Sequence, residues 1–175
     1  RNLLTPRWIQ LLVIKRLAFL IQLFFYVGAP SVASTDILAG TVEKVVDGDT
    51  IVFQGSGTKT QRVRLADIDT PELDQPWGEE AKAALKGWAE NRRAEIRIVD
   101  TDRYGRSVAT LWIDGENINR RLVAEGHAWL YRRYLRDQAL PGLEASAKAS
   151  GLGLWSGKDV IEPRVWRQRR RSQAK

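Results

Sequence analysis

The chain is expected to fold as an α+β domain in which five strands form a small closed sheet, with one helix in the middle and two at the end. Two observations lead to this prediction. Short runs rich in β-branched residues alternate with turn residues over positions 37–68 and 94–113. Between and after these runs, apolar residues recur with the period of a helix. The 175 residues, 43% hydrophobic and 28% charged, provide one such domain and terminal extensions.

The first three strands are expected at residues 37–46, 49–54 and 60–68. Asp47-Gly48 separates the first two runs and is a strong signal for a tight hairpin turn. Gly55-Ser56-Gly57 turns the chain again before the third run.

Residues 79–92 change to a helical period, with apolar residues at positions 81, 85, 88 and 89 and charged residues on the opposite face. The fourth and fifth strands are expected at residues 94–99 and 107–113. Two further helices are expected at residues 118–125, which end before Gly126, and at residues 140–150, which have Pro141 in their first turn.

The net charge of +7 is unevenly distributed along the chain. Residues 1–34 carry four basic groups and residues 164–175 carry six, with no acidic group in either segment. Without these ten, 18 of the 28 basic residues remain against 21 acidic ones, so residues 35–163 have a net charge of −3. The predicted domain is therefore not basic, and a nucleic-acid site in it must depend on individually placed arginines.

The N-terminal segment, residues 1–34, contains an apolar run at residues 17–29 between Lys15-Arg16 and a group of small residues. This pattern is typical of a secretory signal, and the run is shorter than the roughly 20 residues that span a bilayer. Since residues 8–14 are also apolar, an uncleaved membrane anchor and a buried helix are the alternatives. We expect a secreted or periplasmic protein, membrane-anchored if the segment stays attached. The chain has no methionine, and we expect its natural start upstream.

The C-terminal segment, residues 161–175, is strongly basic and has no apolar periodicity, so we expect a mobile tail. Its arginines surround Trp166, a combination that binds nucleic acid through phosphate contacts and base stacking. A solvated tail without a ligand is the alternative.

The metal chemistry open to this chain is restricted by composition. With no cysteine and a single histidine, His127, any bound metal must be held by oxygen, which favours calcium, magnesium or manganese. His127 follows the helix-ending Gly126 and is expected to have a structural role.

Two carboxylates and a carbonyl are expected to converge at one rim of the sheet. Asp49 ends the first hairpin turn and Asp69 ends the third strand. Pro71 forces the strand to stop and leaves the Thr70 carbonyl free as a further ligand. Two carboxylates, one carbonyl and waters suit calcium. A purely structural role of Asp47 and Asp49 as turn residues is the alternative.

Two arginines accompany these carboxylates, and a guanidinium grips a phosphate through parallel hydrogen bonds. Arg106 follows the turn Tyr104-Gly105, and Arg64 lies on the third strand. Since side chains alternate along a strand, Arg64 and Asp69 would point to opposite faces. We therefore expect a bend or bulge at residues 66–68 that brings them together.

Three segments carry a resemblance to a known family: Asp47-Gly48-Asp49-Thr50, Val63 through Glu72, and Asp102 through Arg106. In residue type, order and spacing they resemble the staphylococcal nuclease family over about residues 38–157. The resemblance implies a five-stranded barrel of the oligonucleotide-binding (OB) type with three helices. It also implies a calcium-dependent nuclease that hydrolyses DNA and RNA with low sequence specificity.

The resemblance also implies roles for single residues. By this resemblance, calcium would be bound by Asp49, Asp69 and the Thr70 carbonyl, and Glu72 would take the proton of the attacking water. Arg64 and Arg106 would stabilise charge on the phosphate in the transition state. The residues expected to contact substrate are Arg103, Tyr104, Tyr131 and Tyr134.

Other readings of the same chain remain. A binding module could use the same barrel for recognition without cleavage, although such relatives lose catalytic acids or arginines that this chain retains. A domain tethered by its N-terminal segment could contact anionic lipid through the arginine tail. We expect a monomer that binds nucleic acid.

The loop at residues 73–78 is shorter than in the best-known family member. The tryptophans expected in the core are Trp77, Trp88, Trp112, Trp129 and Trp155.

Overall fold

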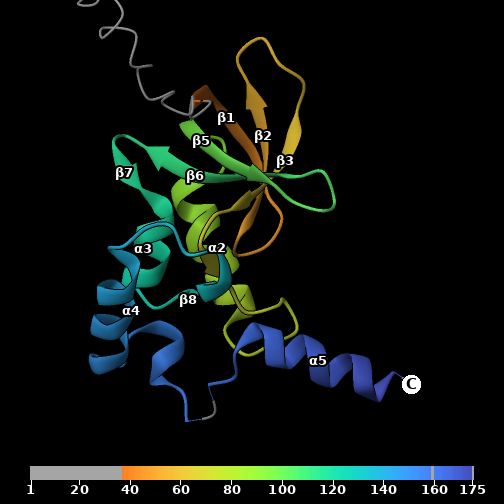
Figure 1. Cartoon of the computed structure of the whole chain (residues 1–175). Helices are drawn as coiled ribbons and strands as arrows, with labels where there is room; N and C mark the ends of the chain where they lie inside the picture. Colours follow the sequence, from red (N-terminus) through yellow and green to blue (C-terminus); the bar gives the residue numbers. More distant parts are fainter. Residues whose placement is uncertain (1–36, 159, 175) are drawn as a thin grey trace, which may run out of the picture. The chain divides into compact units, whose positions relative to one another are not determined.

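The computed structural model describes residues 37–158 and 160–174, and its sheet closes into a barrel (Figure 1). Neighbouring strands pair antiparallel in the order β3-β2-β1-β5-β6, and β3 then pairs parallel with β6 to close the ring. The strands are β1 (Ile37–Val45), β2 (Thr50–Gly55), β3 (Gln61–Leu65), β5 (Arg93–Thr101) and β6 (Ser107–Ile113). The predicted α+β class with a five-stranded OB-type barrel is confirmed.

The barrel interior is filled by alternate residues of each strand. On β2, Ile51 and Phe53 are fully buried, while Val52 and Gln54, which alternate with them, are partly exposed. Val63 and Leu65 do the same on β3. Each strand therefore contributes one apolar face, which is the period-2 pattern that predicted it.

A break in the third predicted strand aligns two functional side chains. β3 ends at Leu65, and Asp67 adopts a left-handed backbone with φ of 66°. The chain then forms the two-residue strand β4 (Ile68–Asp69), which leaves the barrel and pairs with β8 (Trp129–Leu130). The expected irregularity at residues 66–68 is confirmed, and it brings the Asp69 carboxylate to Arg64.

Asn119 completes the barrel where β3 turns away from β6. Its side-chain oxygen accepts a hydrogen bond from the Leu111 amide at 3.0 Å. Its side-chain nitrogen donates to the carbonyl of Ala66 at 3.0 Å. At this seam, where β3 and β6 separate, the buried side chain of Asn119 thus supplies the hydrogen-bond partner for both the Leu111 amide and the Ala66 carbonyl.

The helices cover one end of the barrel. The first, α2 (Gly78–Ala89), buries Ala81, Leu85 and Ala89, three of the four apolar positions used to predict it. α3 (Ile118–Ala124) and α4 (Leu140–Ala149) also match predicted helices within a few residues. The remaining short elements are β7 (Glu116–Asn117) and two 3-10 turns, Arg132–Tyr134 and Gly153–Ser156.

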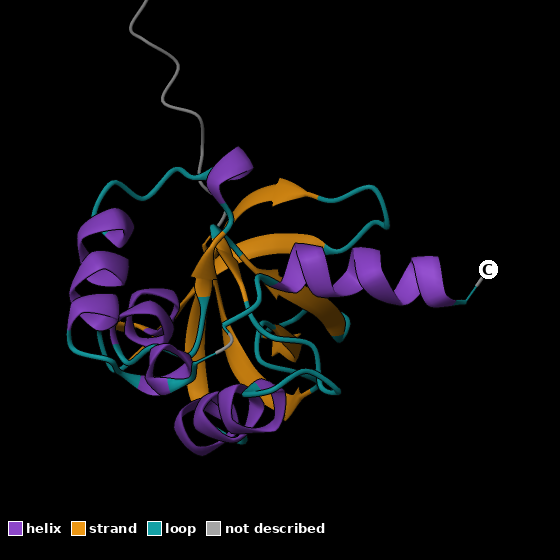
Figure 2. Ribbon diagram, turned by 90° about the horizontal axis from the view of Figure 1, so that it is seen from below, coloured by secondary structure: helices purple, strands orange, loops and turns teal. Residues whose placement is uncertain are grey.

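The prediction of a mobile C-terminal tail is wrong for most of that segment. Residues Pro163–Gln173 form α5, a helix beyond the three that were expected. Pro163 occupies the first turn, where its fixed φ and missing amide hydrogen favour a helix start. In both views α5 projects away from α3 and α4 (Figures 1 and 2).

The five tryptophans expected in the core are only half-buried. Trp88 packs on the core from outside, and the rings of Trp129 and Trp155 meet edge to face at 4.4 Å. Their indoles are large enough to reach the surface from the helices and loops that cover the barrel. His127 has a structural role as expected, because its Nδ1 accepts a hydrogen bond from Trp77 Nε1 at 3.2 Å.

The N-terminal segment, residues 1–34, for which a signal or an anchor was expected, lies outside the described residues. Within the part of the chain that is described, no helix combines the length and apolar character needed to cross a bilayer.

The seam at Asn119 leads to a stability prediction. Asn119→Ala would leave the Ala66 carbonyl and the Leu111 amide without their buried partner, so it should lower the free energy of unfolding by about 3 kcal/mol. Asn117→Ala is the matched control, because Asn117 caps α3 through the Arg120 amide and its loss costs about 1 kcal/mol. Urea unfolding compares the two, and equal losses would contradict the role assigned to Asn119.

Candidate active site

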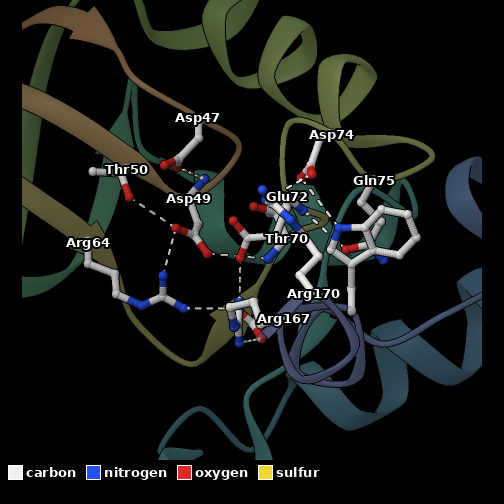
Figure 3. Close-up of polar contacts among 12 residues, drawn as sticks. Asp47, Asp49, Thr50, Arg64, Thr70, Glu72, Asp74, Gln75, Arg167 and Arg170 are labelled. Atoms are coloured by element: carbon white, nitrogen blue, oxygen red, sulfur yellow. Dashed lines mark hydrogen bonds and ion pairs between the residues drawn. The ribbon is translucent and has the colours of Figure 1, made fainter. Parts of the chain in front are cut away.

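Arg64 joins the two carboxylates that were predicted to converge (Figure 3). One terminal nitrogen lies 2.8 Å from Asp49 Oδ1 and the other lies 3.1 Å from Asp69 Oδ1. The second nitrogen also donates to the Ile68 carbonyl at 3.2 Å. The guanidinium therefore fixes the hairpin turn before β2 against the break after β3.

Asp49 is buried and held from several directions. Its backbone amide donates to Asp47 Oδ1 at 3.0 Å, so Asp47 stabilises the turn that presents it. Its own carboxylate accepts from the Thr50 hydroxyl at 3.1 Å and from the Thr70 amide at 3.3 Å. Asp49 is thus both a turn residue and a carboxylate directed at Thr70, which places the two predicted ligand residues in contact.

Beside these residues lies a cavity of about 920 Å³. Seven of the predicted site residues line it together with Asp49 and Thr70: Arg64, Glu72, Arg103, Tyr104, Arg106, Tyr131 and Tyr134. Asp69 is absent from the lining because arginines are hydrogen-bonded to both of its oxygens. The structure therefore brings every predicted site residue to one region of the surface.

Arg106 reaches the cavity but does not contact the carboxylates of Asp49 or Asp69. Its Nε donates to Asp102 Oδ2 at 2.7 Å, and its amide donates to Asp102 Oδ1 at 3.0 Å. Asp102 therefore orients the guanidinium from behind. Burial raises the pKa of the Asp102 carboxyl, but the hydrogen bonds that it accepts from Arg106 and from the Tyr104 amide together outweigh burial and lower this pKa.

The aromatic residues of the cavity are placed beside arginines. Tyr131 and Tyr134 have ring centres 5.2 Å apart, and the Arg64 guanidinium carbon lies 5.9 Å from the centre of the Tyr131 ring. Tyr104 is 69% exposed, and its hydroxyl accepts a hydrogen bond from Arg103 at 2.6 Å. Exposed rings next to guanidinium groups are suited to stacking on bases whose phosphates are held nearby.

Arg167 of α5 is a site residue that the sequence analysis missed. One terminal nitrogen lies 2.7 Å from Asp69 Oδ2, and the other lies 2.7 Å from Glu72 Oε1 and 3.2 Å from Asp69 Oδ1. The helical spacing of Arg164, Arg167 and Arg171 after Pro163 was the available signal. The residues at that spacing are arginines and not apolar residues. The search for apolar residues at a helical period, which found the other helices, therefore did not detect this helix.

Burial sets the electrostatics of the pair Asp49 and Arg64. Burial raises the pKa of the Asp49 carboxyl to about 6, and the attraction of Arg64 offsets only part of this effect. The negative charge of Asp49 in turn raises the pKa of Arg64, which stays protonated. Burial lowers the pKa of Arg167, but hydrogen bonds to Asp69 and Glu72 outweigh this effect and raise it.

The donor atoms fit a hard divalent cation. Asp49 and Asp69 are buried carboxylates linked by a single guanidinium, and the backbone of Thr70 adjoins both. Among the residues that the structure describes, no group of three or more His, Cys, Asp or Glu side chains is arranged to hold a metal. A cation there would therefore take its remaining ligands from the Thr70 carbonyl and water, as calcium does.

Comparison with known proteins gives a consistent result. The staphylococcal nuclease homologue family matches residues 62–157. An uncharacterized endonuclease of Haemophilus influenzae is 36% identical over 127 residues, which cover 73% of this chain and 71% of the relative. Protein ParB of Escherichia coli is 39% identical over 75% of this chain and 80% of its own length. A micrococcal nuclease of Shigella flexneri is 36% identical over 74% of this chain and 80% of its own length.

The raised pKa of Asp49 leads to a prediction about pH. Since the Asp49 carboxyl holds its proton more tightly in the folded state, its contribution to stability is present below about pH 4 and is lost as the pH rises through about 6. Asp49→Asn removes this dependence, so the variant should gain up to about 3 kcal/mol relative to wild type on going from pH 4 to pH 7.

Urea unfolding in chelator at the two pH values measures this gain. Ser56→Ala, an exposed substitution in the turn between β2 and β3 that changes no titratable group, is the control and should differ from wild type equally at both pH values. An Asp49→Asn variant whose difference from wild type does not change with pH would contradict the effect of burial.

Proposed function

Because the chain belongs to the staphylococcal nuclease homologue family, we propose that it is a calcium-dependent nuclease that hydrolyses DNA and RNA with little sequence preference. The observation that carries the proposal is the Arg64 guanidinium between two buried carboxylates, beside a cavity that Glu72 and Arg106 also line. These groups supply a cation site, a base and two phosphate ligands within one region.

Asp49, Asp69 and the Thr70 carbonyl would hold the calcium ion. Bound there, calcium supplies positive charge that polarises a phosphate oxygen and favours deprotonation of water. The protein's contribution is to hold both carboxylates in fixed orientations, which it does through Arg64, Thr50 and the Thr70 amide.

Glu72 is the proposed general base. It follows Pro71 at the edge of the cavity, and its side chain is 37% exposed, so an attacking water has access to its carboxylate. Glu72 would accept a proton from that water while the water oxygen forms a bond to phosphorus. The bond between phosphorus and the leaving oxygen breaks in the same step.

Arg64 and Arg106 are the proposed transition-state ligands. Arg64 lies on β3 and Arg106 lies in the turn just before β6, and both line one cavity. Each guanidinium is fixed by a carboxylate, Arg64 by Asp49 and Arg106 by Asp102. Such preorganised donors stabilise the charge that accumulates on the phosphate oxygens without having to reorganise during the reaction.

Substrate selection would rest on stacking and phosphate contacts. Tyr104, Tyr131 and Tyr134 present rings beside arginines, and every base offers a flat face to such rings. Phosphate contacts carry no sequence information. Low sequence specificity and cleavage of both DNA and RNA follow from these two modes of recognition.

The calcium requirement leads to the first functional prediction. Labelled DNA and RNA should both be degraded with calcium present, and degradation should stop when calcium is chelated and resume when it is restored. Gel analysis with calcium, magnesium or chelator measures this. Full cleavage in excess chelator would contradict the metal assignment, and binding without cleavage would favour the recognition module.

Arg64 and Arg106 lead to the second functional prediction. Arg64→Lys and Arg106→Lys keep the charge but lose the planar pair of donors, so each should lower turnover by about 100-fold or more. Arg62→Lys is the matched control, since Arg62 is exposed on β3 two residues before Arg64. A variant whose turnover stays within a few-fold of the control would show that its arginine is not a transition-state ligand.

A further inference from the structure

The helix α5 lies against the segment that carries the site carboxylates (Figure 3). Trp166 Nε1 donates to Asp74 Oδ1 at 3.3 Å, and Arg170 lies 2.8 Å from Asp74 Oδ2. Gln75 Nε2 donates to the Ile161 carbonyl at 2.6 Å, just before the helix begins. These contacts hold α5 beside the residues that follow Asp69.

Arg167 is the contact that reaches into the site. Asp69 has a side-chain exposure of 4%, and all of its side-chain hydrogen bonds in the described structure come from Arg167 and Arg64. Arg167 also forms an ion pair with Glu72, the proposed base, and its terminal nitrogen lies 2.7 Å from Glu72 Oε1. The Arg167 guanidinium is thus paired at once with Asp69, a proposed metal ligand, and with Glu72, the proposed base.

The charges of the cluster show what a calcium ion would change. Three carboxylates, Asp49, Asp69 and Glu72, face two guanidiniums, Arg64 and Arg167, which leaves a net formal charge of −1. A dication added beside Arg167 would bring the cluster to +1 and place like charges together around a buried carboxylate. A dication in exchange for Arg167 would bring it to zero.

The attachment of α5 is of a kind that can be exchanged. Of its described residues only Pro163 is buried, and Val165 and Trp166 are half-buried, so the helix packs through few apolar side chains. It is held by ion pairs and hydrogen bonds at Asp69, Glu72 and Asp74, whose partners Arg167 and Arg170 are 35% and 62% exposed. The pair of Arg170 with Asp74 is exposed on both sides, so it stabilises weakly and is screened by salt. The Asp69 side chain is only 4% exposed and needs a positive charge beside it, which a dication can supply in place of Arg167.

We propose that α5 is a displaceable cap on the site, in which Arg167 takes the place of the divalent cation on Asp69 and leaves when the cation binds. The proposal rests on the calcium site of the proposed function and adds a closed, metal-free state to it. In that state Asp69 and Glu72 are both engaged by α5, so one movement frees a metal ligand and the base.

The first test measures calcium affinity without nucleic acid. Titration calorimetry on the full chain compares wild type, Arg167→Gln and Arg169→Gln, which removes the same charge from the same helix at an exposed position that does not contact the site carboxylates. Arg167→Gln should bind calcium about tenfold more tightly, because the ion no longer displaces a bidentate ion pair. Arg169→Gln should change the affinity less than twofold.

The second test follows the helix itself in a protein with Arg167 intact. Since the chain has no cysteine, Ser172→Cys in the last turn of α5 provides a single site for a nitroxide label. Saturating calcium should increase the mobility of this label, and should leave unchanged a label at Ser56→Cys in the turn between β2 and β3.

Equal calcium affinities of Arg167→Gln and Arg169→Gln, or a Ser172 label that stays immobile at saturating calcium, would overturn the cap. If wild type still cleaves DNA only with calcium, the proposed function survives that result. Cleavage in chelator with no calcium binding by any variant would instead overturn the calcium site and the cap together.

Discussion

The bridge that Arg64 forms between Asp49 and Asp69 is the interaction on which the rest of the site depends. Asp49 lies in a hairpin turn and Asp69 follows the break after β3, so neither position alone determines the distance between them. Arg64 hydrogen-bonds to both and to the Ile68 carbonyl, which fixes the two turns against one another. The left-handed residue Asp67 makes this possible, since a regular strand would direct Asp69 to the opposite face.

Two buried carboxylates require positive charge nearby, because desolvation otherwise favours their neutral forms. The protein provides this charge in two different ways. Arg64 lies on β3, which is paired on both sides with β2 and β6, and its side chain is 19% exposed, so it is a permanent partner. Arg167 lies on a helix that packs through few apolar side chains, so we propose that it is a partner that a divalent cation replaces. The difference in attachment separates a residue that shapes the site from one that controls access to it.

The features that the sequence predicted well are those with a local cause. Strand alternation, the Asp47-Gly48 turn and the helix period predicted five strands in a small closed sheet and three helices, while the OB-type barrel came from the family resemblance. Because side chains alternate along a strand, the expected meeting of Arg64 with Asp69 required the break at residues 66–68. The docking of α5 was not predictable in this way. It depends on contacts between Arg167 and Asp69, 98 positions apart, and local sequence reasoning does not place such pairs. The peripheral position of the tryptophans was missed for the same reason, since it depends on packing. Asp102 and Arg106, by contrast, are four positions apart in one turn, so their pairing had a local cause that the sequence analysis did not use.

A crystal structure of the full chain grown with calcium tests the central claim most directly. The account predicts an ion bound by the carboxylates of Asp49 and Asp69 and by the Thr70 carbonyl, with Arg64 still beside them and Arg167 withdrawn from Asp69. An ion held elsewhere, or an ion bound at this site while Arg167 remains hydrogen-bonded to both oxygens of Asp69, would contradict it.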